Sequence, residues 1–270
     1  MKTKFHLWSL VAFTLMSVTP VGATVIIADS FDGSGAASLH GTSPNIFSSA
    51  ITAAGGSAVW NAGAAFRADG SVVNGSFVSA GLPVGSYIND TKGNGDGLFT
   101  LTATIAGITG GTTADVNRWV SVNFLSPPGG AGAFNPNNAI YNSPNRGVGI
   151  ALRRQATGTT YFNITPGGTG AVTTNWPTVA DDVTFSVELD LRSWNGTTDF
   201  GSLRFFRDGS GSPEHTVALT ADYDFTHVGF GANMGASSTI SDFSLTQVPE
   251  PSSSLLLLLA GSVAVLRRRR

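Results

Sequence analysis

The segment VTFSVELDL at residues 183–191 alternates between apolar and polar side chains along its whole length. Successive side chains of a β-strand point to opposite faces. The alternation therefore predicts a strand with one face in a core and the other in solvent. The apolar positions are Val183, Phe185, Val187, Leu189 and Leu191.

The same period-two pattern recurs on both sides of this stretch, with glycine-rich turn sequences in between and no sustained helical period in the body. Further stretches of this kind lie at residues 99–105, 119–124, 147–152, 203–205, 228–230 and 241–245. Many short antiparallel strands at this spacing are typical of a sandwich or a barrel. We predict an all-β fold, a two-sheet antiparallel β-sandwich (jelly roll), over residues 24–247.

Composition excludes several classes of function. The chain of 270 residues has no cysteine, which rules out disulfides, thiolate metal sites, iron–sulfur clusters and a cysteine nucleophile. Residues 24–248 hold 9 basic and 16 acidic side chains, so the body carries 9 − 16 = −7. An acidic body argues against nucleic acid and anionic lipid as partners.

The N-terminus has the parts of a secretory signal peptide. Lys2 and Lys4 precede a mostly apolar run at residues 7–18, and Pro20 and the small residues up to Ala23 follow it. We predict a signal peptide at residues 1–23, export by the Sec machinery and cleavage after Ala23. The alternative, an N-terminal membrane anchor, would need a longer apolar run.

The C-terminus predicts a membrane-targeted tail at residues 248–270. Pro249, Glu250 and Pro251 form an extended hinge, since two prolines one residue apart continue neither a strand nor a helix. The apolar residues 252–266 would span about 22 Å as a helix, against a hydrocarbon core of about 30 Å, and snorkelling arginines could extend that reach. The last four residues, Arg267, Arg268, Arg269 and Arg270, would hold the tail in the cytoplasm.

This order of hinge, short leucine-rich span and terminal arginine cluster resembles the PEP-CTERM sorting signal of Gram-negative bacteria. The resemblance implies a partner, the membrane protease exosortase, that cuts near the Pro-Glu-Pro. It also implies a transient anchor in the inner membrane and delivery to the cell surface or extracellular matrix.

The body resembles a concanavalin A-like, laminin-G-type jelly roll. The similar segments are the opening DSFDG at residues 29–33, LHGTSP at 39–44 leading towards Trp60, residues 119–124, LRFFRDG at 203–209, VGF at 228–230 and ISDF at 240–243. The resemblance implies a binding fold, with carbohydrate as the plausible ligand.

Glu188 and Asp190 are the candidate catalytic residues, since a glycosidase needs two carboxylates and these stand on one face of a strand. Glucanases of the concanavalin-like fold carry a Glu-x-Asp-x-Glu strand, but here Arg192 replaces the second glutamate, so the proton donor is missing. The alternative is a solvated strand face with an Asp190/Arg192 or cross-strand charge pair.

Asp90, Asn94 and Asp96 are the candidate calcium ligands, because they gather oxygen atoms in a glycine-rich loop. Lys92 and Ala103 occupy positions where an EF-hand-type loop would need acids, so Asx turns explain the loop more simply. Asp29 and Asp32 form a second candidate of the same kind. We expect no cofactor, with calcium as the alternative.

The remaining candidates are three histidines and a set of aromatic residues. His40, His215 and His227 have no metal-ligand spacing, and we expect His227 to be a half-buried structural residue. The aromatic residues would either fill the core or form a sugar-stacking surface; they are Trp60, Trp119, Trp176, Trp194, Tyr141 and Tyr161.

Together these observations predict an exported, non-enzymatic surface or matrix protein whose body binds a ligand, plausibly an extracellular polysaccharide, or serves as structure. The alternative is a glycoside-active enzyme on the same fold that uses Glu188 and Asp190.

Overall fold

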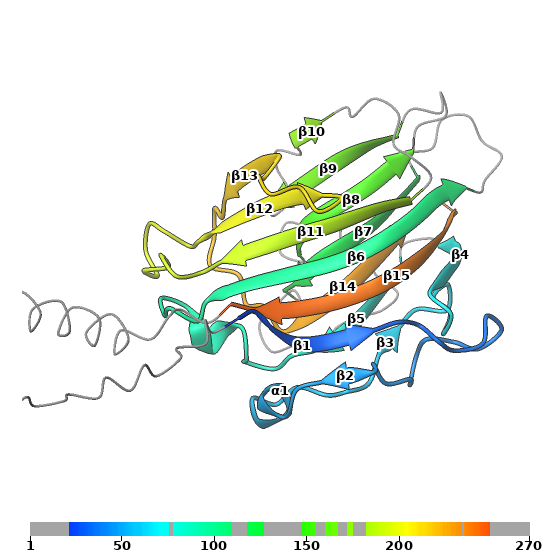
Figure 1. Cartoon of the computed structure of the whole chain (residues 1–270), viewed down its shortest axis with the longest axis horizontal. Helices are drawn as coiled ribbons and strands as arrows, with labels where there is room; N and C mark the ends of the chain where they lie inside the picture. The colour runs from blue at the N-terminus through cyan, green and yellow to red at the C-terminus, as the bar shows by residue number, and fades with distance from the viewer. Residues whose placement is uncertain are drawn as a thin grey trace, which may run out of the picture. The chain divides into compact units, whose positions relative to one another are not determined.

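The computed structural model describes residues 22–75, 78–109, 118–126, 147–154, 160–166, 172–174, 182–233 and 235–248. These residues form two antiparallel sheets with almost no helix, which confirms the predicted all-β sandwich. Figure 1 shows one sheet lying in front of the other. Residues 1–21 of the expected signal peptide, and the hinge, apolar span and arginine tail after Val248, lie outside the described residues.

The first sheet has the last strand of the body near its middle. Its order is β13 (His215–Ala218), β12 (Ser202–Arg207), β11 (Asp182–Asp190), β6 (Leu98–Thr109), β15 (Ala236–Gln247), β1 (Thr24–Asp29) and β2 (Ile46–Phe47), with β4 (Ser71–Gly75) also paired to β15.

The second sheet covers the inner face of the first. Its order is β10 (Val172–Thr174), β9 (Thr160–Pro166), β8 (Val148–Arg154), β7 (Arg118–Leu125), β14 (His227–Asn233), β5 (Val78–Pro83) and β3 (Asn61–Ala62).

The core between the sheets is made of the side chains that the alternation placed inside. Strand β11 contributes Val183, Phe185, Val187 and Leu189, and β7 contributes Val120, Val122 and Phe124, all at most 1% exposed. Burying each such side chain stabilises the fold by roughly 1.5–3 kcal/mol. The polar face of β11 points away from the core, where Thr184 and Ser186 hydrogen-bond to Thr104 and Thr102 of β6.

An aromatic cluster closes one part of this core. The buried ring of Trp60 stacks on Phe230 at 5.5 Å between centroids, and its Nε1 donates a hydrogen bond of 2.6 Å to Asp29 Oδ2. Asp29 Oδ1 accepts a second bond from the Phe31 amide, and burial raises the pKa of this carboxyl. Asp29, a predicted calcium ligand, is thus an internal hydrogen-bond acceptor, and Asp32 accepts from the Ser30 hydroxyl.

The body begins and ends on neighbouring strands. Thr24 of β1 pairs with Gln247 of β15, and the Val248 amide donates to Leu98 O at 2.9 Å. Among the described residues, no helix is long and apolar enough to span a bilayer.

Candidate binding pocket

A pocket of about 460 Å³ lies where three connecting segments meet beside β14. The segments are the turn after α1 (Ser49–Ala53), the residues that follow β5, and the residues that lead into β14. The lining residues are Gly55, Pro83, Gly85, Ser86, Asn89, Asp224, Thr226 and His227. This volume falls in the range of about 300–1,000 Å³ that small-molecule sites occupy.

Backbone contacts hold the three segments together. Gly85 has a φ of +59°, and a Cβ there would lie 2.0 Å from Ala54 O, so only glycine allows the two backbones to approach this closely. The Ser86 amide donates to the same Ala54 O at 2.9 Å, and the Val84 amide donates to Thr226 O at 2.8 Å. The pocket is therefore built on fixed backbone and does not need a ligand to assemble it.

Asn89 fixes the acidic wall of the pocket. It begins the 3-10 turn η1 (Asn89–Thr91), and its amide nitrogen donates to Asp224 Oδ1 at 2.7 Å and to Phe225 O at 3.1 Å. Its amide oxygen accepts from the Phe225 N–H at 3.0 Å, and the Phe225 side chain is fully buried. Asp224 is exposed, and its Oδ2 has no hydrogen-bond partner within the described part of the chain.

His227, three residues after Asp224, adds a neutral ring to the lining of the pocket. Burial lowers its pKa from 6.5 to about 4, so the imidazole is uncharged at neutral pH. Its Nδ1 lies 2.9 Å from the Thr226 hydroxyl oxygen. The expectation of a half-buried residue in a strand pattern holds, since His227 is the first residue of β14, but the sequence did not indicate that it lines a pocket.

The predicted calcium ligands are engaged in other contacts. The Asp90 carboxylate accepts from the Ser86 hydroxyl at 2.7 Å, and the Asn94 amide donates to Asp90 O at 3.1 Å. The backbone oxygen of Asp96 accepts from Gln247 Nε2 at 2.9 Å. In the described ranges, no three His, Asp or Glu side chains are grouped to hold a metal, and no cofactor is established.

The predicted catalytic carboxylates lie elsewhere, on the outer face of the first sheet. Arg204 Nη2 contacts Glu188 Oε1 and lies 3.8 Å from Asp190 Oδ2, while Arg192 binds both oxygens of Asp190 at 2.6 and 2.9 Å. Burial raises the pKa of Glu188, whereas the hydrogen bonds from Arg192 lower the pKa of Asp190. Both charge pairs that the sequence offered as the alternative to catalysis are present.

The predicted aromatic surface divides into core and periphery. Trp60 is fully buried, and Trp119 packs against Ala151 with 1% exposure. Trp194 is partly exposed in the loop after β11. Trp176 and Tyr141, and the side chain of Tyr161, lie outside the described residues.

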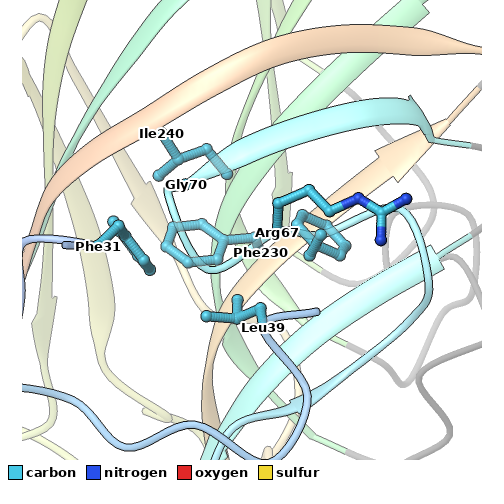
Figure 2. A pocket seen from close by; sticks show the side chains of 7 residues that line it. Phe31, Leu39, Arg67, Gly70, Phe230 and Ile240 are labelled. Atoms are coloured by element: carbon cyan, nitrogen blue, oxygen red, sulfur yellow. The ribbon is translucent and has the colours of Figure 1, made fainter. Parts of the chain in front are cut away.

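A second hollow is a packing crevice that offers no room for a ligand. Figure 2 shows Phe31, Leu39, Phe230 and Ile240 converging on it, while the guanidinium of Arg67 points away from them. The space admits no water-sized sphere, so the crevice belongs to the core around Trp60.

Comparison with known proteins identifies the C-terminal segment. Residues 247–270 match the PEP-CTERM protein-sorting motif. The match contains the Pro-Glu-Pro of residues 249–251 and the four terminal arginines, and it implies export, passage through a membrane-anchored state and processing by exosortase. The PEP-CTERM match does not cover the sandwich domain. None of the curated proteins matches the chain.

Several solved structures resemble the chain at low identity. The alginate lyase Aly36B is 12% identical with a TM-score of 0.43, covering 84% of this chain and 98% of that one. The alginate lyase vAL-1 from Chlorella virus is 10% identical with a TM-score of 0.39 (66% and 84% covered). The potassium-bound carbohydrate recognition domain of Emp46p is 9% identical with a TM-score of 0.38 (69% and 87% covered). All three TM-scores are below 0.5.

Proposed function

We propose that this is a cell-surface or extracellular-matrix protein of a Gram-negative bacterium whose sandwich binds a neutral saccharide and catalyses no reaction. The signal peptide is removed after Ala23, the tail is held for a time in the inner membrane, and exosortase cuts near Pro249. We assign the body to the concanavalin A-like, laminin-G-type jelly rolls.

The chemistry of the pocket supports a ligand rich in hydroxyl groups. Asp224, His227, Ser86 and Thr226 line one space, and they bring to it a carboxylate, a neutral imidazole and two hydroxyl groups. These groups donate and accept hydrogen bonds in the mixed pattern that adjacent sugar hydroxyls require. This convergence in a preformed pocket is the observation that carries the proposal.

Charge favours a neutral saccharide over an acidic one. The body carries 9 − 16 = −7, and the lining set holds one acidic residue, Asp224, and no lysine or arginine. An anionic polymer would meet repulsion both at long range and at the pocket itself.

We propose that the body is not catalytic because the carboxylates of Glu188 and Asp190 are engaged in ion pairs. Arg204 of β12 contacts Glu188, and Arg192 of the turn after β11 holds Asp190. A glycosidase needs one of its two carboxyls to deliver a proton to the substrate. Such ion pairs are expected of a cross-strand charge network.

A glycan-binding screen tests the pocket. The full chain, purified in a zwitterionic detergent that carries no sugar head group, is titrated with neutral, amino and acidic saccharides. We expect neutral saccharides to bind and Asp224→Asn to lower their affinity by about 10-fold or more, the value of a hydrogen bond to a charged group. Asp32→Asn, outside the lining set, is the matched control. Preference for acidic saccharides, or equal binding by both variants, would contradict the proposal.

The sorting part is tested by intact mass spectrometry of the protein recovered from its native surface or medium. The expected mass starts at Thr24 and ends near residues 249–251. A mass that retains residues 255–270 would mean that the tail is a permanent anchor.

A further inference from the structure

We propose that Trp194 and Asp222 form a second sugar subsite beside the pocket, so that the ligand is an oligosaccharide and not a single sugar. This inference rests on the proposed saccharide function and adds the length of the ligand and two residues that recognise it.

Two chain segments run side by side from the pocket to Trp194. Asn89 contacts Asp224 and Phe225, and three residues further on Lys92 Nζ donates to Asp222 Oδ1 and to Tyr223 O, both at 2.7 Å. The pocket wall and the surroundings of Trp194 are therefore parts of one continuous ledge, residues 89–92 against residues 222–225.

The segment at residues 222–225 alternates like a strand. Tyr223 and Phe225 are buried at 5% and 0% exposure with their rings stacked, while Asp222 and Asp224 are exposed. Residues two apart in an extended chain lie about 7 Å from each other on the same side. The two carboxylates therefore stand in a row along the ledge.

The two carboxylates are presented in the same way. Asp224 Oδ1 accepts from Asn89, and Asp222 Oδ1 accepts from Lys92 and from Trp194 Nε1 at 3.1 Å. In the described part of the chain neither Oδ2 has a hydrogen-bond partner. Each acid is fixed to the scaffold by one oxygen and offers the other to a hydroxyl group. Lys92 also neutralises Asp222, which keeps the ledge suited to an uncharged ligand.

The Trp194 ring is held in place before any ligand arrives. Asn195 Oδ1 accepts from the backbone amides of Thr197, Thr198 and Asp199, each at 3.0 Å, and this locks the loop. Gly196 has a φ of +74°, and a Cβ there would lie 3.0 Å from the ring atom Cη2, so glycine lets the turn lie against the indole. Lys92 Nζ is 5.7 Å from the ring centroid.

Nothing in the core requires a tryptophan at this place. Trp60 and Trp119 are buried, whereas Trp194 is partly exposed and has no aromatic neighbour among the described side chains. An amphipathic ring on a rigid loop, beside a row of hydrogen-bond acceptors, is suited to packing against the apolar face of a sugar.

The test is a length series. Neutral β-linked gluco-oligosaccharides of one to six units are titrated calorimetrically into the full chain in a sugar-free detergent. For the wild type, affinity should rise as the ligand grows beyond one unit. Trp194→Ala should lower the affinity for the longer oligosaccharides by about 3- to 10-fold, which is the value of an aromatic contact. The affinity for the single sugar should stay within about twofold.

The controls separate this inference from the proposed function. Phe206→Ala removes a partly exposed aromatic residue from β12, off the ledge, and should leave the length dependence unchanged. Equal affinity for all lengths in the wild type, or an equal loss for all lengths in Trp194→Ala, would overturn the second subsite while the pocket stands. If no saccharide of any length binds, the proposed function itself fails.

Discussion

Two pairs of acidic residues have the same spacing in the sequence and opposite surroundings in the fold. Glu188 and Asp190 on β11 have side chains that are 15% and 18% exposed, and arginines contact both. Asp222 and Asp224 lie on the ledge before β14, and the Asp222 side chain is 48% exposed. The spacing of two carboxylates therefore does not by itself predict a functional site, because neighbouring cations determine whether their oxygen atoms are available.

Strand register explains the difference. Arg204 of β12 lies directly opposite Glu188, so the antiparallel ladder itself brings a cation to the acid. Residues 222–226 precede β14 and have no strand opposite them within the described sheets. Each of these acids is held through one oxygen, Asp224 by Asn89 and Asp222 by Lys92 and Trp194, which leaves the other oxygen available.

Among these tests, acidification should give the largest change in the free energy of unfolding, and His227 in the pocket should cause it. Unfolded His227 takes up a proton below pH 6.5, whereas folded His227 resists it until about pH 4, so the unfolded state binds more protons in this window. The free energy of unfolding should therefore fall by up to about 3 kcal/mol between pH 6.5 and pH 4. Urea unfolding at several pH values measures it, and His227→Gln should flatten the curve. If the free energy of unfolding of that variant falls with pH as steeply as in the wild type, other groups cause the pH dependence.

Removing the central cation of the strand network should give the next largest effect. Arg204→Met leaves the mostly buried Glu188 beside Asp190 with less counter-charge, which should cost about 2 kcal/mol at pH 7. Because burial raises the pKa of Glu188, the loss should shrink as the pH falls and this carboxyl takes up a proton. The double variant Glu188→Gln/Arg204→Met should recover most of the stability. Additive losses in chemical denaturation would show that the two side chains act independently.

The smallest effect is expected on saccharide affinity when the two acids of β11 are replaced. Glu188→Gln/Asp190→Asn should leave saccharide affinity within about twofold of the wild type, in contrast to Asp224→Asn, because neither residue lines the pocket. Mass spectrometry after prolonged incubation should find the oligosaccharides intact with either protein. Cleavage by the wild type that this double variant loses would favour the glycosidase alternative.

The sequence predicted the strands well because alternation is a local property. The inward positions of residues 183–191 and 119–124 are all buried, and the polar face of β11 is where the pattern placed it. The Asp190/Arg192 pair was also accessible to sequence reasoning, since both residues belong to one short segment.

The pocket could not be found in this way. Its residues come from positions near 55, 83–89 and 224–227, and nothing in any one segment indicates that the others are close. Asn89 stands beside the Asx-rich loop in the sequence, yet it holds the backbone of residues far along the chain. Lys92 argued against calcium in the sequence, and in the structure it serves as the counter-ion of Asp222.

The place of β15 in the first sheet has a consequence for the order of events during export. This strand contains the last residues of the body, yet it lies between β6 and β1 and also pairs with β4. A chain that emerges from its N-terminus onward cannot close this sheet until residues 236–247 have crossed, because three strands wait for the same partner. We expect a chain that ends at residue 235 to stay sensitive to protease, and resistance would contradict this. The domain can therefore complete its folding only after the residues directly before the sorting signal have emerged.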